Sequence, residues 1–146
     1  MSCIFCRIVA GEVKAEVVAR EPDVVAFLDV QPLADGHVLV VPRAHVAAVE
    51  DLEPAAADAL FRQVTRLARP VREALGAAGT TIGVNNGEAT GQTIAHVHVH
   101  IVPRWHGDGA GSIHTIFPRK ASRPLADVGA AIRRAAGENQ GDLGLT

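Results

Sequence analysis

The sequence predicts an α+β domain: a mostly antiparallel, five-stranded sheet with one long helix packed across it and a helical tail at the C-terminus. Two patterns lead to this prediction. Short segments rich in valine and isoleucine alternate with turn-forming residues, which is typical of strands joined by tight connections. Between the third and fourth of these segments, apolar residues recur every three or four positions, which is the period of an amphipathic helix. Strands that pair beneath such a helix form an α+β architecture.

Three of the predicted strands precede the helix. Residues 17–21 and 24–30 are rich in valine, and the Glu-Pro-Asp segment that joins them favours a turn, so together they predict a hairpin. Residues 37–43 follow an Asp-Gly turn and predict the third strand. Pro42 should limit this strand, because a proline cannot donate a backbone hydrogen bond to a sheet.

The long helix is predicted within residues 51–79, where the apolar residues on one face are Leu60, Val64, Leu67, Val71 and Leu75. Pro54 suits the first turn of a helix, where its missing N–H costs no hydrogen bond. Pro70 lies inside the pattern and removes one backbone bond, so we expect a kink or a short break near residues 66–70.

Two more strands are predicted after the helix, over residues 80–86 and 95–104, with a polar loop over residues 87–93 between them. Helical spacing returns in the segment RPLADVGAAIRRAAG. We therefore expect one domain over residues 1–120 and a C-terminal helical extension over residues 121–146 whose end is frayed.

The composition is that of a globular protein without a strong charge. The chain has 146 residues, of which 48% are hydrophobic and 21% charged, and its formal net charge is −2. This charge gives no basis for binding a nucleic-acid polymer or an anionic membrane surface. No apolar run reaches the roughly 20 residues that span a bilayer, and the N-terminus lacks the pattern of a signal peptide. We expect a cytoplasmic protein with neither kind of partner.

Residues 96–104, HVHVHIVPR, place three of the seven histidines at alternate positions. Alternate side chains of a strand share one face at a spacing of roughly 6.5–7 Å, so His96, His98 and His100 should form a row while the residues between them face the core. Three interpretations fit this row: hydrogen-bonded histidines without chemistry, a metal site built on His-x-His, or nucleophilic catalysis by imidazole.

The loop before the histidine row helps to choose among these interpretations. Residues 85–93, NNGEATGQT, offer backbone N–H donors around Gly87 and Gly91. The polar side chains of this loop include Asn85, Asn86, Gln92 and Thr93. Such a loop is suited to hold a phosphate, because successive N–H groups form a concave anion site. The combination favours chemistry on a phosphate by an imidazole.

The triad segment HVHVHIV, the GQT before it and the segment DGHVLVVPRAH together resemble the histidine-triad family. The resemblance covers roughly residues 2–105 and implies that family's fold and its homodimer, with the long helix and a strand at the interface. It points toward two branches. The HIVPR segment resembles dinucleoside-polyphosphate hydrolases of the fragile-histidine-triad type. The cysteine motif and compact N-terminus resemble the bacterial nucleoside phosphoramidases.

The resemblance implies a nucleotide hydrolase or transferase with a two-step mechanism. The middle histidine, here His98, would attack the α-phosphate to give a nucleotidyl-histidine, and water would then release a nucleoside monophosphate. His100 would stabilise the phosphoryl charge or orient His98, and His37 matches a fourth, buried histidine of the family. The implied substrates are purine nucleoside monophosphate conjugates, cleaved at a phosphorus–nitrogen bond or an acid anhydride.

The resemblance also assigns residues that bind the nucleotide. Asp29 matches a carboxylate that accepts hydrogen bonds from the ribose hydroxyls, and an ionised aspartate can only accept. Phe5 and Val30 match residues that line the base pocket. The positions assigned to the phosphate and its surroundings are Asn85, Gly91, Gln92 and Thr93.

The two cysteines, Cys3 and Cys6, favour a metal site or free thiols over a disulfide if the protein is cytoplasmic. The resemblance implies a structural zinc ion, because many bacterial members of the family carry zinc on positions that match Cys3, Cys6, His45 and His96. Two thiolates and two imidazoles suit tetrahedral zinc, with no coordination position left open.

Two other classes of function are compatible with parts of the pattern. A nucleotide-binding or interaction module with little catalysis would keep the same pocket. A metal-dependent enzyme of the cupin type is disfavoured, because no glutamate follows His98 and His100 at a suitable spacing.

Overall fold

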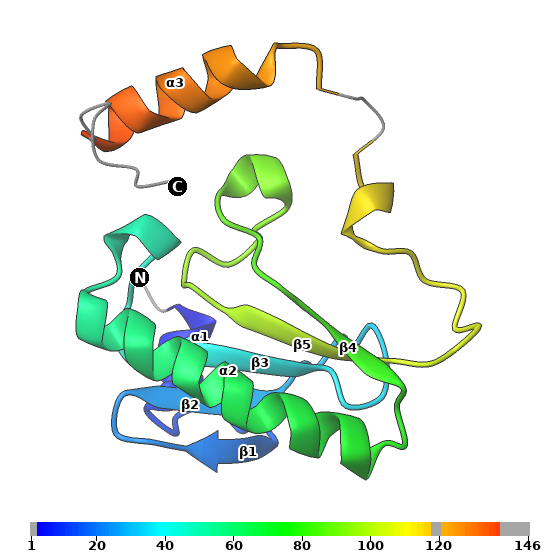
Figure 1. The fold of residues 1–146 in the computed structure, drawn as a ribbon. Helices are drawn as coiled ribbons and strands as arrows, with labels where there is room; N and C mark the ends of the chain where they lie inside the picture. The colour runs from blue at the N-terminus through cyan, green and yellow to red at the C-terminus, as the bar shows by residue number, and fades with distance from the viewer. Residues whose placement is uncertain (1–2, 118–120, 138–146) are drawn as a thin grey trace. The chain divides into compact units, whose positions relative to one another are not determined.

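The sheet has five strands in the order β1-β2-β3-β5-β4, and every neighbouring pair is antiparallel (Figure 1). The computed structural model describes residues 3–117 and 121–137. The strands are β1 (Val17–Arg20), β2 (Val24–Leu28), β3 (Val38–Pro42), β4 (Gly79–Gly83) and β5 (Val99–Arg104). The helices among these residues are α1 (Ile4–Val9), α2 (Pro54–Ala74) and α3 (Leu125–Ala136). The predicted α+β class is confirmed.

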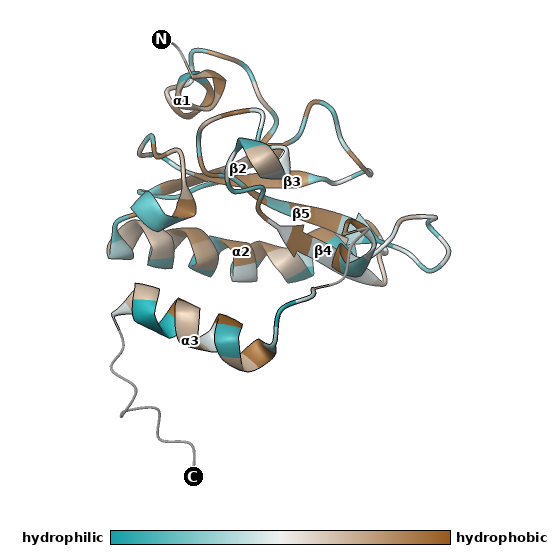
Figure 2. Cartoon of the chain, turned by 90° about the horizontal axis from the view of Figure 1, so that it is seen from above, coloured by the Kyte–Doolittle hydropathy of each residue, from teal (hydrophilic) through white to brown (hydrophobic). Residues whose placement is uncertain are grey.

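The long helix α2 covers one face of the sheet (Figure 2). Its buried residues Leu60, Val64 and Val71 pack against alternate residues of β2, β3 and the triad segment. On the sheet side this core contains Val24, Ala26, Val38, Val40, Val97, Val99 and Ile101. Burial of an aliphatic side chain contributes roughly 1.5–3 kcal/mol, so this layer supplies much of the stability of the domain.

The short helix α1 lies on the opposite face of the sheet (Figure 2). Phe5 and Ile8 of α1 pack against the other set of alternate strand residues, namely Val25, Phe27, Leu39 and Val41. The sequence did not predict α1, because six residues are too few to display a helical period. A helix of this length is unstable alone and depends on the contacts that hold it to the sheet.

The break predicted near residues 66–70 is absent, because α2 runs as one helix through Pro70. Pro70 and Arg66 both lie on the exposed side of the helix. Water can therefore bond the Arg66 carbonyl that a proline at position 70 leaves without a helical partner.

The last strand is shorter than predicted, because β5 begins at Val99 rather than at residue 95. In the observed register Val99 pairs with Val40, so Val97 would stand opposite Pro42, which has no N–H to donate. The Val97 N–H instead donates to the carbonyl of Val46 at 2.7 Å. Within the triad segment, only the last histidine belongs to the paired strand.

The turn before β3 depends on a glycine, as the Asp-Gly pair suggested. Gly36 has a φ of +81°, and a Cβ built there would lie 3.0 Å from the side chain of Leu75. This close approach joins the loop before β3 to the end of α2. It also fixes the position of the neighbouring His37, which is almost fully buried.

The chain forms two units, one ending at Ala110 and one starting at Gly111. In the second unit the helical spacing predicted around Leu125 and Ile132 is realised in α3, where both side chains are exposed. The predicted frayed end lies outside the described residues. Among those residues, no helix has both the length and the apolar character needed to cross a membrane.

Candidate active site and metal cluster

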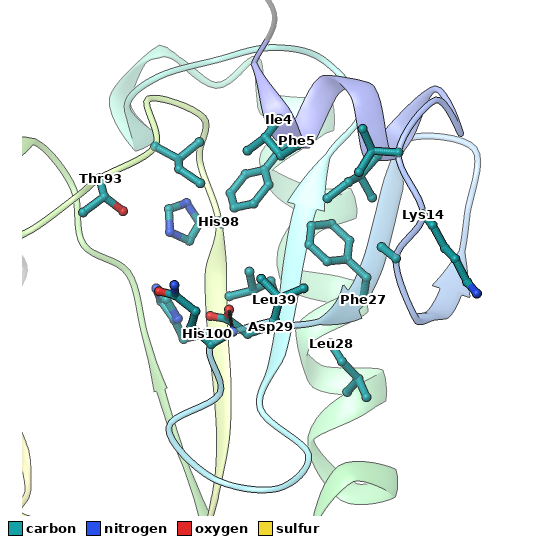
Figure 3. Close-up of a pocket in the computed structure, with 16 residues that line it drawn as sticks. Ile4, Phe5, Lys14, Phe27, Leu28, Asp29, Leu39, Thr93, His98 and His100 are labelled. Atoms are coloured by element: carbon teal, nitrogen blue, oxygen red, sulfur yellow. Dashed lines mark hydrogen bonds between the residues drawn. The ribbon is translucent and has the colours of Figure 1, made fainter.

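A pocket of about 460 Å³ opens between α1, the end of β2 and the histidine triad (Figure 3). Its apolar wall includes Ile4, Phe5, Ile8, Phe27 and Leu39, and its polar end holds Asp29, Thr93, His98 and His100. Six residues predicted from the sequence therefore lie around one cavity: Phe5, Asp29, Val30, Thr93, His98 and His100. The volume is in the range of small-molecule pockets, which span roughly 300–1,000 Å³.

His98 has a defined tautomer. Its Nδ1 lies 2.7 Å from the carbonyl oxygen of His96, and a carbonyl can only accept, so Nδ1 carries the proton. In the neutral imidazole Nε2 then holds a lone pair. The ring is almost fully buried and packs edge-on against Phe5, with the ring centroids 5.1 Å apart. His98 therefore presents a nucleophilic nitrogen within the pocket lining.

His37 and His100 form a chain of hydrogen bonds behind His98. The backbone N–H of Leu33 donates to His37 Nδ1 at 3.1 Å, so the proton of neutral His37 resides on Nε2. That group donates to His100 Nδ1 at 2.9 Å. The remaining proton of His100 is consequently on Nε2, which is buried and has no hydrogen-bond partner among the described residues. This N–H is available to an acceptor atom in the pocket.

Burial keeps these imidazoles neutral. Burial, and to a lesser extent the positive charges that His98 and His37 can carry, lower the pKa of His100 to about 4. Burial also lowers the pKa of His37, although the nearby Asp29 opposes this effect. The Asp29 carboxylate lies 3.7 Å from His37 Nδ1, but His37 is neutral and its Nδ1 accepts the Leu33 hydrogen bond, so the two groups form no ion pair.

Asp29 lies at the end of β2 on the same edge of the sheet as the histidines. Its Oδ1 accepts the backbone N–H of Gln31 at 2.9 Å, which fixes the carboxylate at the pocket. Phe27 and Asp29 are two residues apart and line the same cavity. Leu28, between them, lines the cavity too, so strand alternation alone does not identify these residues, and the sequence interpretation omitted both Phe27 and Leu28.

The loop over residues 85–93 is held by its own side chains. The Gln92 amide donates to the carbonyls of Ala47 and Ile94, and its oxygen accepts the Gly87 N–H. The N–H groups of residues 90–92 bond to carbonyls within the same loop. Thr93 lines the pocket, whereas Asn85, Gly91 and Gln92 lie outside its lining.

Asn86 has a structural role that the sequence did not reveal. Its amide oxygen accepts the Val49 N–H at 2.9 Å, and its amide nitrogen donates to Glu50 at 2.7 Å. These bonds connect the loop to the segment before α2, and they depend on residues 36 or 37 positions away.

The four residues predicted to bind a metal form one cluster, Cys3, Cys6, His45 and His96. The sulfur atoms of Cys3 and Cys6 each lie 3.6 Å from His96 Nδ1, and Cys6 lies 3.3 Å from His45 Nδ1. Ligand atoms of a tetrahedral zinc site with bonds of about 2.0–2.3 Å stand roughly 3.3–3.8 Å apart. The distances therefore fit such an ion.

The tautomer of His96 also suits a metal. Its Nε2–H donates to the Pro42 carbonyl at 2.8 Å, which leaves the Nδ1 lone pair directed at the two thiols. Desolvation and the neighbouring Cys3 raise the pKa of the Cys6 thiol, and the positive charge of a bound cation would oppose this effect. Both the geometry and the donor set fit the ion that the resemblance implies.

Comparison with known proteins identifies the family. The model of the HIT domain family matches residues 10–107. The chain is 38% identical over 113 residues to Protein hit of Bacillus subtilis, an alignment that covers 77% of this chain and 78% of the relative. It is 36% identical over 104 residues to adenosine 5′-monophosphoramidase hnt1 of Schizosaccharomyces pombe, covering 71% and 75% of the two chains.

A solved structure agrees with these sequence matches. The zinc-bound histidine-triad family protein of Mycobacterium smegmatis superposes with a TM-score of 0.72 at 35% identity, covering 94% of each chain. The resemblance drawn from the triad segment is confirmed. The chain belongs to the HIT domain family.

Proposed function

We propose that the protein is a nucleotide hydrolase or transferase that uses His98 as its nucleophile. The observation that carries this proposal is the hydrogen bond from His98 Nδ1 to the His96 carbonyl, because it leaves the Nε2 lone pair in the pocket. A neutral imidazole with a fixed tautomer is an effective nucleophile near pH 7. The relative named adenosine 5′-monophosphoramidase supports this class of reaction.

In the first step His98 Nε2 attacks the α-phosphorus, a nitrogen–phosphorus bond forms, and the bond to the leaving group breaks. The leaving group departs with the bonding electron pair and takes a proton from solvent. The positive charge that develops on His98 is stabilised by the His96 carbonyl that holds Nδ1–H. In the second step water attacks the phosphorus, the nitrogen–phosphorus bond breaks, and a nucleoside monophosphate is released.

His100 supports both steps as a hydrogen-bond donor. Its buried Nε2–H has no partner among the described residues and is available to a phosphoryl oxygen. The His37 Nε2–H donates to His100 Nδ1 at 2.9 Å. The His100 proton therefore stays on Nε2, which would face the phosphate. Donors of this kind contribute roughly 10²–10³ in rate when they meet the charge of the transition state.

The rest of the pocket suits a nucleoside. Asp29 offers carboxylate oxygens to the ribose hydroxyls, and Phe5 and Val30 offer apolar surface to the base. Thr93, which lines the polar end, is placed to contact the phosphate. The loop beside the phosphate would be shaped by Gln92, Gly91 and Asn85. We propose a purine nucleoside monophosphate conjugate as the substrate, cleaved at a phosphorus–nitrogen bond or an acid anhydride.

We propose zinc as the ion held by Cys3, Cys6, His45 and His96. With four protein ligands the ion would be structural and would hold the N-terminal segment to the sheet. The zinc-bound structural relative supports this assignment.

We further propose a homodimer in the cytoplasm, without nucleic-acid or membrane partners. β4 is an edge strand of the sheet, and an open edge can pair with a second copy. Ile82 on β4 and Phe61 on α2 are exposed apolar residues, and the resemblance places the long helix and a strand at the interface.

The test is release of AMP from adenosine 5′-phosphoramidate by the wild type and by His98→Ala. We expect release by the wild type and a loss of at least about a thousandfold in the variant. His106→Ala provides a matched control, because His106 is exposed and lies outside the pocket lining. Turnover by His98→Ala near the wild-type rate would refute the nucleophile. AMP binding without release by the wild type would favour the binding-module alternative.

A further inference from the structure

Phe5 lies between the metal cluster and the pocket. In sequence it stands between Cys3 and Cys6, and in space its ring contacts two histidines of the triad. Its centroid is 5.9 Å from that of His96, a cluster residue, and 5.1 Å from that of His98. Phe5 is 5% exposed and lines the pocket (Figure 3). One side chain therefore touches both sites.

The pocket wall that carries Phe5 depends on its attachment to the sheet. α1 has only six residues, far below the ~12–15 at which an isolated helix becomes marginally stable. Its attachment has two parts, the apolar packing of Phe5 and Ile8 and the thiols of Cys3 and Cys6, which approach His96 and His45. Ile4, Phe5 and Ile8 all line the pocket, so a change at the thiols reaches the wall directly.

A second connection runs through His96. Its ring faces the thiols through Nδ1, while its backbone carbonyl accepts the Nδ1–H of His98. The residue that would bind the metal therefore also fixes the tautomer of the nucleophile. The first connection reaches the pocket wall that binds the nucleotide, whereas the second reaches the nucleophile, so the Kd for AMP reports the connection through Phe5.

We propose that the cluster controls nucleotide binding through Phe5, and that oxidation of Cys3 and Cys6 to a disulfide turns this control off. The inference rests on the proposed function. The thiols are partly exposed and His45 is exposed, so a small oxidant such as hydrogen peroxide can reach them. Cys3 and Cys6 stand three positions apart at the start of a helix, where side chains are neighbours.

The two thiolates lose two electrons and form one sulfur–sulfur bond. Hydrogen peroxide accepts these electrons and, with two protons, becomes two molecules of water. A disulfide offers no thiolate, so the zinc ion loses two of its four ligands and is released. The wall formed by α1 is then held only by its apolar packing.

The first experiment measures the Kd of the full-length protein for AMP by calorimetry, with zinc release followed by a chromogenic chelator. Peroxide should release the zinc and raise the Kd about tenfold, within the range usual for coupled sites. Dithiothreitol with added zinc should restore the original Kd. A strong chelator under reducing conditions should raise the Kd to the same extent. The chain has two cysteines and one methionine, which limits the sulfur atoms that peroxide can oxidise.

The second experiment assigns the coupling to Phe5 by a thermodynamic cycle. Phe5→Ala should bind AMP more weakly while keeping its zinc, and removal of the zinc should then change the Kd by less than about twofold. Val30→Ala is the matched control, because Val30 lines the pocket but belongs to the loop after β2. In that variant zinc removal should still raise the Kd about tenfold. Far-ultraviolet circular dichroism checks that each variant is folded.

The outcomes separate this inference from the proposed function. An unchanged Kd after verified zinc release, in a protein that binds AMP when reduced and loaded with zinc, would overturn the inference alone. An equal effect of zinc removal in Phe5→Ala and in the wild type would overturn the role of Phe5. If the reduced, zinc-loaded protein failed to bind AMP, the proposed function would fail and this inference with it.

Discussion

At the scale of single residues, the chemistry of the two sites depends on where the protons of four imidazoles reside, three of them placed by backbone groups. These groups are the His96 carbonyl for His98, the Leu33 N–H for His37, and the Pro42 carbonyl for His96. His100 receives its tautomer from His37. The triad therefore offers three different groups. His98 offers a lone pair to a phosphorus atom, His100 offers an N–H to an oxygen atom, and His96 offers a lone pair to a metal.

His37→Leu tests the positioning part of this arrangement. The change removes the donor that faces His100 Nδ1, so the His100 proton is no longer confined to Nε2. We expect kcat for AMP release to fall about tenfold, or ~1.4 kcal/mol, with little change in KM. Long-range ¹H–¹⁵N spectra should show His100 shifting from one tautomer to a mixture. Unchanged kcat together with an unchanged spectrum would show that His37 has no such role.

The stability of the fold should fall in mild acid because of His100. Its folded pKa is about 4, whereas a histidine in the unfolded chain titrates near 6.5. Between these values the unfolded state binds more protons, so the free energy of unfolding decreases as the pH falls from about 6.5 to about 4 and levels off below. His37 and His96 add to this effect because burial lowers the pKa of both.

Urea denaturation across this pH range, performed on the wild type and on His100→Gln, isolates the contribution of His100. The variant should show a shallower decrease, because one titrating group is gone. Identical slopes in the two proteins would contradict the depressed pKa.

At the scale of secondary-structure elements, the site is built where the end of β2 and the start of β3 lie beside the triad segment, and α1 covers this face of the sheet. The alternation of histidine and apolar residues predicted this part of the fold, because a period of two is visible within a few residues. Helix α1 was not predictable, since six residues carry no visible period. The predicted start of β5 was also wrong, because the first paired residue depends on Pro42 in a neighbouring strand rather than on the triad itself.

The loop before β3 offers a test of how one glycine joins two elements. Gly36 has a φ of +81° and would place a Cβ 3.0 Å from Leu75, whereas Gly11 has a φ of +79° with nothing within 4 Å. Gly11→Ala should therefore cost about 1 kcal/mol of stability from strain alone, and Gly36→Ala about 2–3 kcal/mol.

The pair can be compared by urea denaturation. When Leu75→Ala is combined with Gly36→Ala, the extra loss of stability caused by Gly36→Ala relative to Gly11→Ala should become smaller. The reason is that Leu75→Ala removes the atoms that the new Cβ approaches. Equal losses in the two single variants would show that the contact with Leu75 carries no energetic weight.

At the scale of the whole molecule, the family could be identified from the sequence because its motifs are contiguous and their spacing is local. The tautomers of His96 and His100 could not be predicted, since they depend on groups distant in the chain. The same holds for the hydrogen bond from the Gln92 amide to Ala47 and for the contacts of Phe5 with two histidines. His37 and His100, for example, are 63 positions apart. The metal cluster was predictable in part, because its residue types could be recognised in the sequence but its geometry could not.

Removal of zinc should lower the stability of the whole domain. An ion that binds only the folded state at a hundred times its Kd contributes about 2.7 kcal/mol, which corresponds to a decrease in Tm of roughly 5–10 °C for a chain of this size. Differential scanning calorimetry with and without chelator measures this change. An unchanged Tm after verified removal of the ion would show that the cluster does not support the fold.

The role of His98 as nucleophile is tested most directly by a search for the covalent intermediate. The protein is mixed with adenosine 5′-phosphoramidate, quenched in base within milliseconds to seconds, digested and analysed by mass spectrometry. We predict an adenylyl group on the peptide that contains His98, formed and lost at rates that account for AMP release, and absent from His98→Ala. Steady AMP release by the wild type without an adduct on His98, or with an adduct on another residue, would contradict the proposed mechanism.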